Sequence, residues 1–282
     1  MTSAKRTGFT TEDLLILTKT YPTPSQQYRE TTCVAALTKE GELRRLFPIP
    51  FRLLAGEDRF KRWEWVRMKL SQKTSDARPE SRKIEIDSII RPGDFVDTSR
   101  GWIRRLELIE RHKVSDPDTL EERRRTTGET LGFIEPARCV SLEITPVDNP
   151  EWTPAEVEKL RAEGLFDTAE ARTRTLLRKL PVDFHYRYEC ETPQGRKEFR
   201  HKVTDWEFAA LYWNCVNRNG PKGWESAFRN KVERDFFSSR RMVFLLGTMR
   251  FHPHRWLLVG VVYPPKRPDV VPPPQLDLGL DP

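Results

Sequence analysis

The chain ends in a proline-rich segment that cannot build a core of its own. Between Pro264 and Pro282 the sequence holds seven prolines and no aromatic residue. Proline fixes φ and lacks a backbone N–H, so such a segment favours extended backbone of the polyproline II type. The sequence therefore predicts a disordered Pro-rich tail over 264–282, and it confines the folded body to residues 1–263.

The body carries enough apolar surface to fold. The 282-residue sequence contains 8 Trp, 15 Phe and 6 Tyr, side chains that each bury a large area. This aromatic content excludes a wholly disordered chain. The longest apolar runs, 242–246 and 256–263, are shorter than the ~20 residues of a membrane helix, and the first residues do not form an export signal. We expect a cytoplasmic protein that binds no membrane.

The pattern of apolar residues predicts an α+β fold whose first third is a curled antiparallel β unit. Segments 28–37 and 42–54 are predicted strands joined by a turn at 39–41, and 59–70 and 83–90 are further strands. A helix-like stretch around Glu12 and Asp13 precedes them.

The rest of the body alternates between helices and hairpins. Helices are predicted after Ser99, over 118–127 and over 154–163, where Thr153 and Glu156 form a capping box. The C-terminal unit is predicted as β-hairpin, two helices, β-hairpin. We expect domains at 1–148, a β-rich basic unit with helices that binds nucleic acid, at 149–263, an α+β unit, and at 264–282, the flexible tail.

The hexapeptide Gln275–Leu280, QLDLGL, resembles the peptide by which bacterial replication and repair proteins bind the sliding clamp. The resemblance covers these six residues and implies nothing about the body. It implies that Gln275 is the polar anchor, that Leu276 is a shallow contact with Asp277 at the permitted acidic position, and that Leu278 and Leu280 fill the apolar pocket. Gly279 departs from the pattern, which often has proline there. The alternative is a tail that folds back over its own body.

Cationic and aromatic residues lie close together in the predicted β unit. They are Arg59, Lys61, Arg62, Trp63, Trp65, Arg67 and Lys69. Each base that stacks on an aromatic side chain contributes about 1–3 kcal/mol to binding, and phosphates form ion pairs with the cations. With the formal net charge of +7, this pattern predicts a DNA-binding surface. The alternative is that one of the two tryptophans packs in the core and that basic side chains cover an apolar rim.

A carboxylate-rich segment supports a second hypothesis, a metal-dependent nuclease. A strand over 83–87 points Lys83, Glu85 and Asp87 in one direction. Together with Asp76 and Glu80, these residues are candidates for holding Mg²⁺ and a scissile phosphate. The Asp…Glu-x-Lys order of that nuclease class is absent, and the alternative is a salt-bridged strand face.

Cysteine and histidine suggest a zinc site only weakly. The candidate ligands are Cys190, His201 and Cys215, with a fourth from His252 or His254. Their spacing matches no compact zinc module, so we expect no metal.

Together these features predict a DNA-binding protein of replication, repair or DNA defence, recruited to the bacterial sliding clamp by its C-terminal peptide. Its expected partners are DNA and the clamp, and it needs no cofactor. The alternatives are a nuclease that uses Mg²⁺ and a non-enzymatic protein-interaction adaptor.

Overall fold

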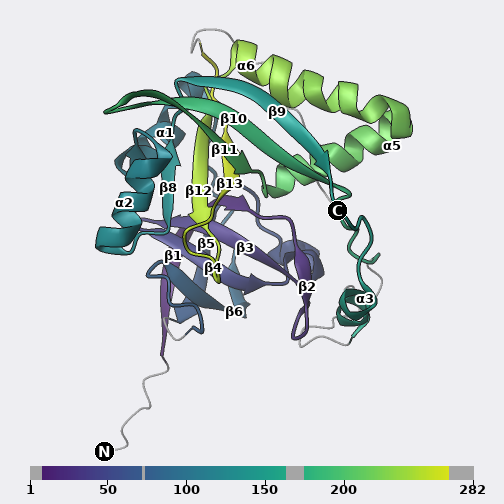
Figure 1. The fold of residues 1–282 in the computed structure, drawn as a ribbon. Helices are drawn as coiled ribbons and strands as arrows, with labels where there is room; N and C mark the ends of the chain where they lie inside the picture. The colour runs from purple at the N-terminus through teal and green to yellow at the C-terminus, as the bar shows by residue number, and fades with distance from the viewer. Residues whose placement is uncertain (1–7, 72–73, 163–174, 267–282) are drawn as a thin grey trace, which may run out of the picture.

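The computed structural model describes residues 8–71, 74–162 and 175–266, and it places three β-sheets and several helices there (Figure 1). The expected α+β class is confirmed. The N-terminal strands, purple to blue in Figure 1, occupy the lower part of the view, and most of the later strands and helices lie above them. The clamp-like peptide Gln275–Leu280 and most of the expected tail lie outside the described residues.

The N-terminal unit is a closed β-barrel. Its strands are β1 (Phe9–Lys19), β3 (Arg29–Thr38), β4 (Leu43–Ile49), β5 (Trp65–Ser71) and β6 (Ser81–Ile90). The order around the barrel is β1-β3-β4-β6-β5, and β5 pairs back onto β1. All pairs are antiparallel except β4 with β6. This connectivity is that of the OB-fold, a Greek-key barrel. The short β2 (Thr23–Ser25) pairs beside β3.

The expectation of a helix-like stretch around Glu12 and Asp13 is wrong, because both residues lie in strand β1. Leu14 and Ile16 belong to the core inside the barrel, while Leu15 and Leu17 pack in a second core outside it. A strand that is buried on both faces shows no alternation of polar and apolar residues, so its period is hidden in the sequence.

A second sheet covers one side of the barrel. It contains β7 (Lys113–Val114), β8 (Leu131–Ile134), β12 (Val243–Thr248) and β13 (Trp256–Val262) in the order β13-β12-β8-β7. Leu15 and Leu37 of the barrel share a buried cluster with Phe133 and Leu245 of this sheet. The apolar hairpin expected at 242–248 and 256–263 is therefore confirmed, and it joins the two units.

A third sheet and the long helix α5 complete the fold. The sheet has the order β11-β10-β9, with β9 (Arg138–Pro146), β10 (Val182–Thr192) and β11 (Gly195–Lys202). Helix α5 (Trp206–Arg229) kinks at Gly220, whose φ is 67°, just before Pro221, and α6 (Phe236–Ser239) follows. Aromatic side chains pack this sheet against its neighbours. The ring centroids of Phe184 in β10 and Phe228 in α5 are 4.8 Å apart, and those of Tyr186 in β10 and Phe244 in β12 are 5.5 Å apart.

The remaining helices are α1 (Ser99–Ile109), α2 (Pro117–Thr127) and α3 (Pro154–Arg161). The capping box expected at Thr153 and Glu156 is present. Helix α2 ends at Thr127, as expected from the sequence, and Gly128 after it adopts a left-handed conformation with φ 82°. None of the helices in the described ranges is both long and apolar enough to cross a membrane.

Strand pairing puts the boundary between the units earlier than the expected residue 148. Gly132 in β8 lies opposite Leu246 in β12, and β9 pairs with β10. Residues 113–146 therefore belong to the C-terminal unit. The short strand β8 pairs with β12, more than 100 residues away, and with β7, 20 residues away. It shows no local sequence pattern that predicts a strand.

Candidate nucleic-acid interface

Of the two tryptophans expected to stack on bases, one lies in the interior and the other is half-buried. Trp63 is only 3% exposed, and the Arg105 guanidinium lies 4.9 Å from its ring centroid. The same guanidinium lies 4.8 Å from the ring of Trp102. Trp65 is half-buried and packs against the apolar cluster that contains Trp63 and Trp102. For Trp63 the interpretation as a base-stacking residue is wrong, and the alternative that one of the two tryptophans packs in the core holds. For Trp65 base stacking stays a prediction.

Two of the expected DNA-binding arginines are used inside the molecule. Arg62 donates hydrogen bonds to the carbonyl oxygens of Leu17 (2.9 Å) and Val261 (3.0 Å), and it pairs with Glu207 at 2.6 Å. Arg59 donates two hydrogen bonds to the Leu54 carbonyl. Neither guanidinium is presented to a nucleic acid, so this part of the expectation is corrected as well. Lys61, beside them, is exposed.

Arg67 and Lys69 lie on the outer face of β5, but both are ion-paired. Arg67 binds Asp13 at 2.7 Å and lowers the pKa of that carboxyl to about 2 by hydrogen bonding. Lys69 pairs with Glu85 at 3.0 Å. Thr11, Glu85 and Asp87 join them around a shallow depression of about 400 Å³. The carboxylates offset the positive charge that a phosphate would need.

The four nuclease carboxylates do not converge. As expected, Glu85 and Asp87 lie on the outer face of β6, between buried isoleucines. Asp76, however, is buried against Arg78, and Glu80 accepts hydrogen bonds from the backbone and hydroxyl of Thr130. Holding Mg²⁺ and a scissile phosphate together requires carboxylate oxygens that point toward one common position. The four carboxylates therefore form no shared Mg²⁺ site in the described part of the chain.

The candidate zinc ligands are not assembled either. Nδ1 of His201 is hydrogen-bonded to the Tyr188 hydroxyl at 2.8 Å, and burial lowers the pKa of His201 to about 4. Burial raises the pKa of Cys190 to about 12, which disfavours the thiolate that zinc requires. Cys215 is buried in the core. Within the described ranges, no group of three or more His, Cys, Asp and Glu is placed to hold a metal ion.

A different site appears where two loops of the barrel meet the C-terminal unit. A pocket of about 300 Å³, here called the barrel-loop pocket, lies between the β1–β3 loop and the β5–β6 loop. Its lining includes Tyr28, Phe47, Ser75, Asp76, Lys83 and Arg250. Arg250 follows β12 and donates a hydrogen bond of 2.6 Å from Nη2 to the Ser75 carbonyl. The pocket is thus built by both units.

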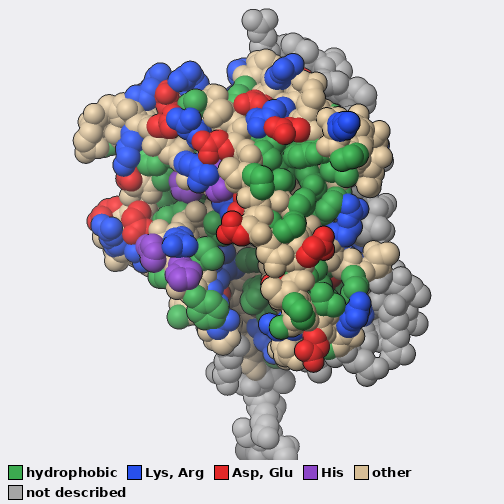
Figure 2. Space-filling model, turned by 45° about the vertical axis from the view of Figure 1, so that its right-hand side comes forward, with side chains coloured by type: hydrophobic (Ala, Val, Ile, Leu, Met, Phe, Trp, Pro, Cys, Tyr) green, Lys and Arg blue, Asp and Glu red, His purple; other side chains and the backbone are tan. Residues whose placement is uncertain are grey.

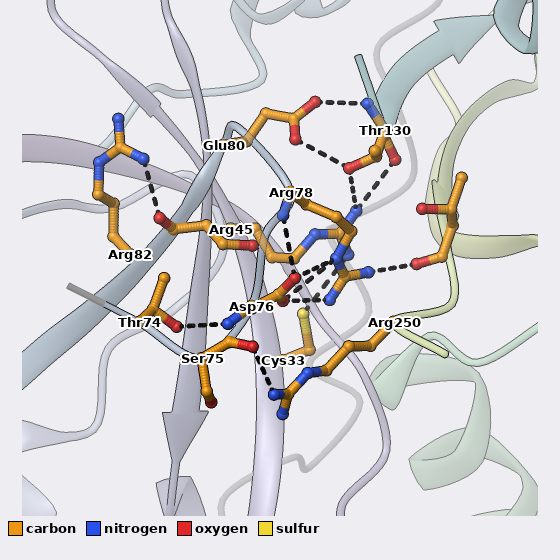
Figure 3. Close-up of polar contacts among 12 residues, drawn as sticks. Cys33, Arg45, Thr74, Ser75, Asp76, Arg78, Glu80, Arg82, Thr130 and Arg250 are labelled. Carbon is orange, nitrogen blue, oxygen red and sulfur yellow. Dashed lines mark hydrogen bonds and ion pairs between the residues drawn. The ribbon is translucent and has the colours of Figure 1, made fainter. Parts of the chain in front are cut away.

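Carboxylates beside the barrel-loop pocket are already satisfied (Figure 3). Burial by itself would raise the pKa of Asp76. The hydrogen bonds and the charge of Arg78 lower it by more, so the pKa of this carboxyl lies below its ordinary value. Glu80 is held by Thr130, to which Arg45 also donates from Nη2 at 3.0 Å.

Lys83 and Arg250, the cations that line the barrel-loop pocket, are not neutralised by a carboxylate of the described residues. In Figure 3 the Arg78 guanidinium contacts the Asp76 carboxylate, whereas the Arg250 guanidinium donates to the backbone carbonyl of Ser75. No carboxylate of the described residues forms an ion pair with Arg250 or Lys83. The pocket therefore keeps positive charge for an anion.

Other charged surfaces are balanced. On the outer face of β9–β11, Arg138 pairs with Glu189 at 2.8 Å and Arg200 with Glu143 at 2.6 Å. On the face in Figure 2, basic and acidic side chains are interspersed, and hydrophobic side chains gather in a band beside them. The net charge of +7 therefore does not produce one continuous cationic surface on that face.

Sequence reasoning missed Arg250, Tyr28 and Phe47 as site residues and assigned Lys83 to a different chemistry. These four residues come from four separate segments of the chain. The available signal was Arg250 with Phe251, a cation and an aromatic side chain in a polar turn between two apolar strands.

The barrel, the second unit and the pocket between their loops define an OB-type protein with an attached α+β unit. Residues 114–278 match the model of a family described as a domain of unknown function (DUF8757), and residues 10–111 match a second such domain (DUF8758). Since the first match spans more than half of the chain, the protein belongs to the DUF8757 family. The two matches meet where the second sheet begins.

No curated protein matches the sequence. Among solved structures, the chain is similar to one described as a Replication Protein A heterotrimer bound to ssDNA. The TM-score is 0.26 and the identity 7%, over 90% of this chain and 65% of that chain. The chain thus spans just under two thirds of the length of that relative.

Proposed function

We propose that this protein binds DNA at the barrel-loop pocket and that its C-terminal peptide recruits it to a bacterial sliding clamp. The observation that carries DNA binding is the excess positive charge of Lys83 and Arg250 between two barrel loops. Loops at these positions of OB-fold barrels bind oligonucleotides, and Lys and Arg supply the phosphate contacts.

The packing of the second sheet explains why the site lies at the loops. In many OB-folds the outer faces of the second and third strands bind the ligand, and here these are β3 and β4. Ala35, Leu37 and Leu43 on these strands are buried against the second sheet. Nucleic acid therefore has access to the end of this face, where Tyr28 and Phe47 border the pocket.

A peptide contact and a DNA contact on one chain reinforce each other. A flexible connection gives the second contact an effective concentration of order millimolar, and the joint affinity rises by about 10²–10⁴. Weak binding at the barrel-loop pocket would thus suffice once the tail holds the protein on a clamp that encircles DNA.

Removing the two cations of the pocket tests DNA binding. We expect Lys83→Ala/Arg250→Ala to bind a labelled oligonucleotide about tenfold more weakly, with a log–log salt slope lower by about 1.4 for single strands, because two phosphate contacts are lost. Fluorescence anisotropy over a salt series measures both quantities. The matched control is Arg67→Ala/Lys69→Ala, whose cations are ion-paired, and it should keep the affinity. A native protein that binds no oligonucleotide at low salt contradicts the proposal.

The tail prediction concerns its last leucines. In a pull-down with purified bacterial sliding clamp, Leu278→Ala/Leu280→Ala should lose at least nine tenths of the bound clamp, because these side chains fill the apolar pocket in the resemblance. Val270→Ala/Val271→Ala changes two apolar residues upstream of the peptide and should bind as the native protein does. Equal capture by all three proteins would rule out recruitment through this peptide.

A further inference from the structure

The turn between β12 and β13 carries an unusually exposed aromatic side chain. This turn, residues 249–255, is here called the hairpin tip. Phe251 in it is 79% exposed, more than any other large hydrophobic side chain in the described part of the chain. The apolar area of an exposed phenylalanine ring stays in contact with water, and burying that area lowers the free energy. The exposure of Phe251 therefore suggests a ligand that covers its ring.

The hairpin tip is held in place rather than left free. Within it, Met249 donates from its backbone N–H to the Arg255 carbonyl at 3.0 Å, and Arg255 donates to the His252 carbonyl at 2.8 Å. The Arg250 hydrogen bond to Ser75 fastens the tip to the barrel at the edge of the barrel-loop pocket. The exposed ring therefore stands beside the site, on a preorganised turn.

The composition of the hairpin tip suits a polyanion. Residues 249–255 contain two arginines and two histidines and no acidic residue. The Arg250 guanidinium lies 4.9 Å from the Phe251 ring centroid, in the range of a cation–π contact. A cation that lines the pocket and an aromatic face above it form the pair that single-stranded nucleic acid uses, with phosphate on one and base on the other.

We infer that Phe251 is a base-stacking residue that extends the barrel-loop pocket and makes the site selective for single-stranded over duplex DNA. This inference rests on the proposed DNA binding. In a duplex both faces of an internal base are occupied by its neighbours, so an unpaired base alone can cover the ring. Arg250 and Lys83 would hold the flanking phosphates in either form, and Phe251 would add affinity for the single strand.

The experiment compares a labelled oligothymidine with a duplex of equal length, both measured by fluorescence anisotropy with the full chain. We expect Phe251→Ala to weaken single-strand binding about tenfold and to leave duplex binding within twofold. Phe251→Trp should keep the single-strand affinity, and its added indole fluorescence should be quenched by the single strand. The matched control is Phe95→Ala, since Phe95 is 49% exposed and does not line the barrel-loop pocket.

The outcomes separate the two claims. If the native protein binds oligothymidine and Phe251→Ala binds it equally well, the stacking role is overturned while DNA binding stands. That result would point to the hairpin tip as a protein-docking element instead. Equal losses on both DNA forms would overturn the strand selectivity. If the native protein binds neither form, the proposed DNA binding itself fails.

Discussion

Replacing Arg62 with alanine is expected to lower the free energy of unfolding by about 3–5 kcal/mol, the cost of removing one partner from a buried ion pair. Arg62 bridges the two units: it comes from the barrel and pairs with Glu207 at 2.6 Å and Asp205 at 3.6 Å, at the start of α5. Its loss also leaves the buried Leu17 and Val261 carbonyl oxygens without this donor.

Denaturant unfolding followed by far-UV circular dichroism measures this change. The neighbouring Lys61→Ala is the matched control, since that side chain is exposed and its removal should change the free energy by no more than about 0.5 kcal/mol. An Arg62→Ala protein within 1 kcal/mol of the native protein would show that the bridge between the units does not hold them together.

The second large effect is a pH dependence that comes from Lys19. Its amine lies 3.9 Å from the Phe51 ring centroid and donates to the Phe60 carbonyl at 3.1 Å. Burial lowers the pKa of Lys19 to about 8 from 10.5. Between these values the unfolded chain binds more protons than the folded one, so the Lys19 contribution to stability increases as pH rises. Below pH 8 its full cost is present.

Comparison with Lys19→Met isolates this contribution. The free energy of unfolding of the native protein, minus that of the variant, should rise by about 3 kcal/mol between pH 8 and 10.5. Lys61→Met, at an exposed lysine, should follow the native pH curve instead. Parallel curves for the native protein and Lys19→Met would mean that Lys19 keeps its ordinary pKa in the folded state, against its placement among Phe51, Phe60 and Trp206.

Local patterns predicted most elements of the body. The capping box at Thr153, the left-handed Gly128 and the apolar hairpin near the end of the body each depend on residues within one turn or one hairpin. The strands that were missed, among them β1, β8 and the short β2 and β7, lack such a pattern. β1 is buried on both faces, and β8 is four residues long with every residue buried.

The site was harder to predict because its chemistry depends on partners. In sequence, Arg62, Trp63, Arg67 and Lys69 look equally available to DNA. In the structure each of these side chains already contacts another residue: Arg62 contacts Glu207, Trp63 contacts Arg105, Arg67 contacts Asp13, and Lys69 contacts Glu85. Burial and ion pairing distinguish a binding cation from a structural one, and neither can be read from the residue type.

The sequence by itself determined which segments are apolar enough to form strands and helices, and where several of them end. The tertiary structure alone decided that the barrel closes with β4 parallel to β6, that the second sheet covers β3, and that Arg250 meets Ser75 across 175 residues of chain. The reason is physical: helix caps and turns depend on neighbours a few residues apart, whereas barrel closure and the charge left in a pocket depend on contacts between distant segments.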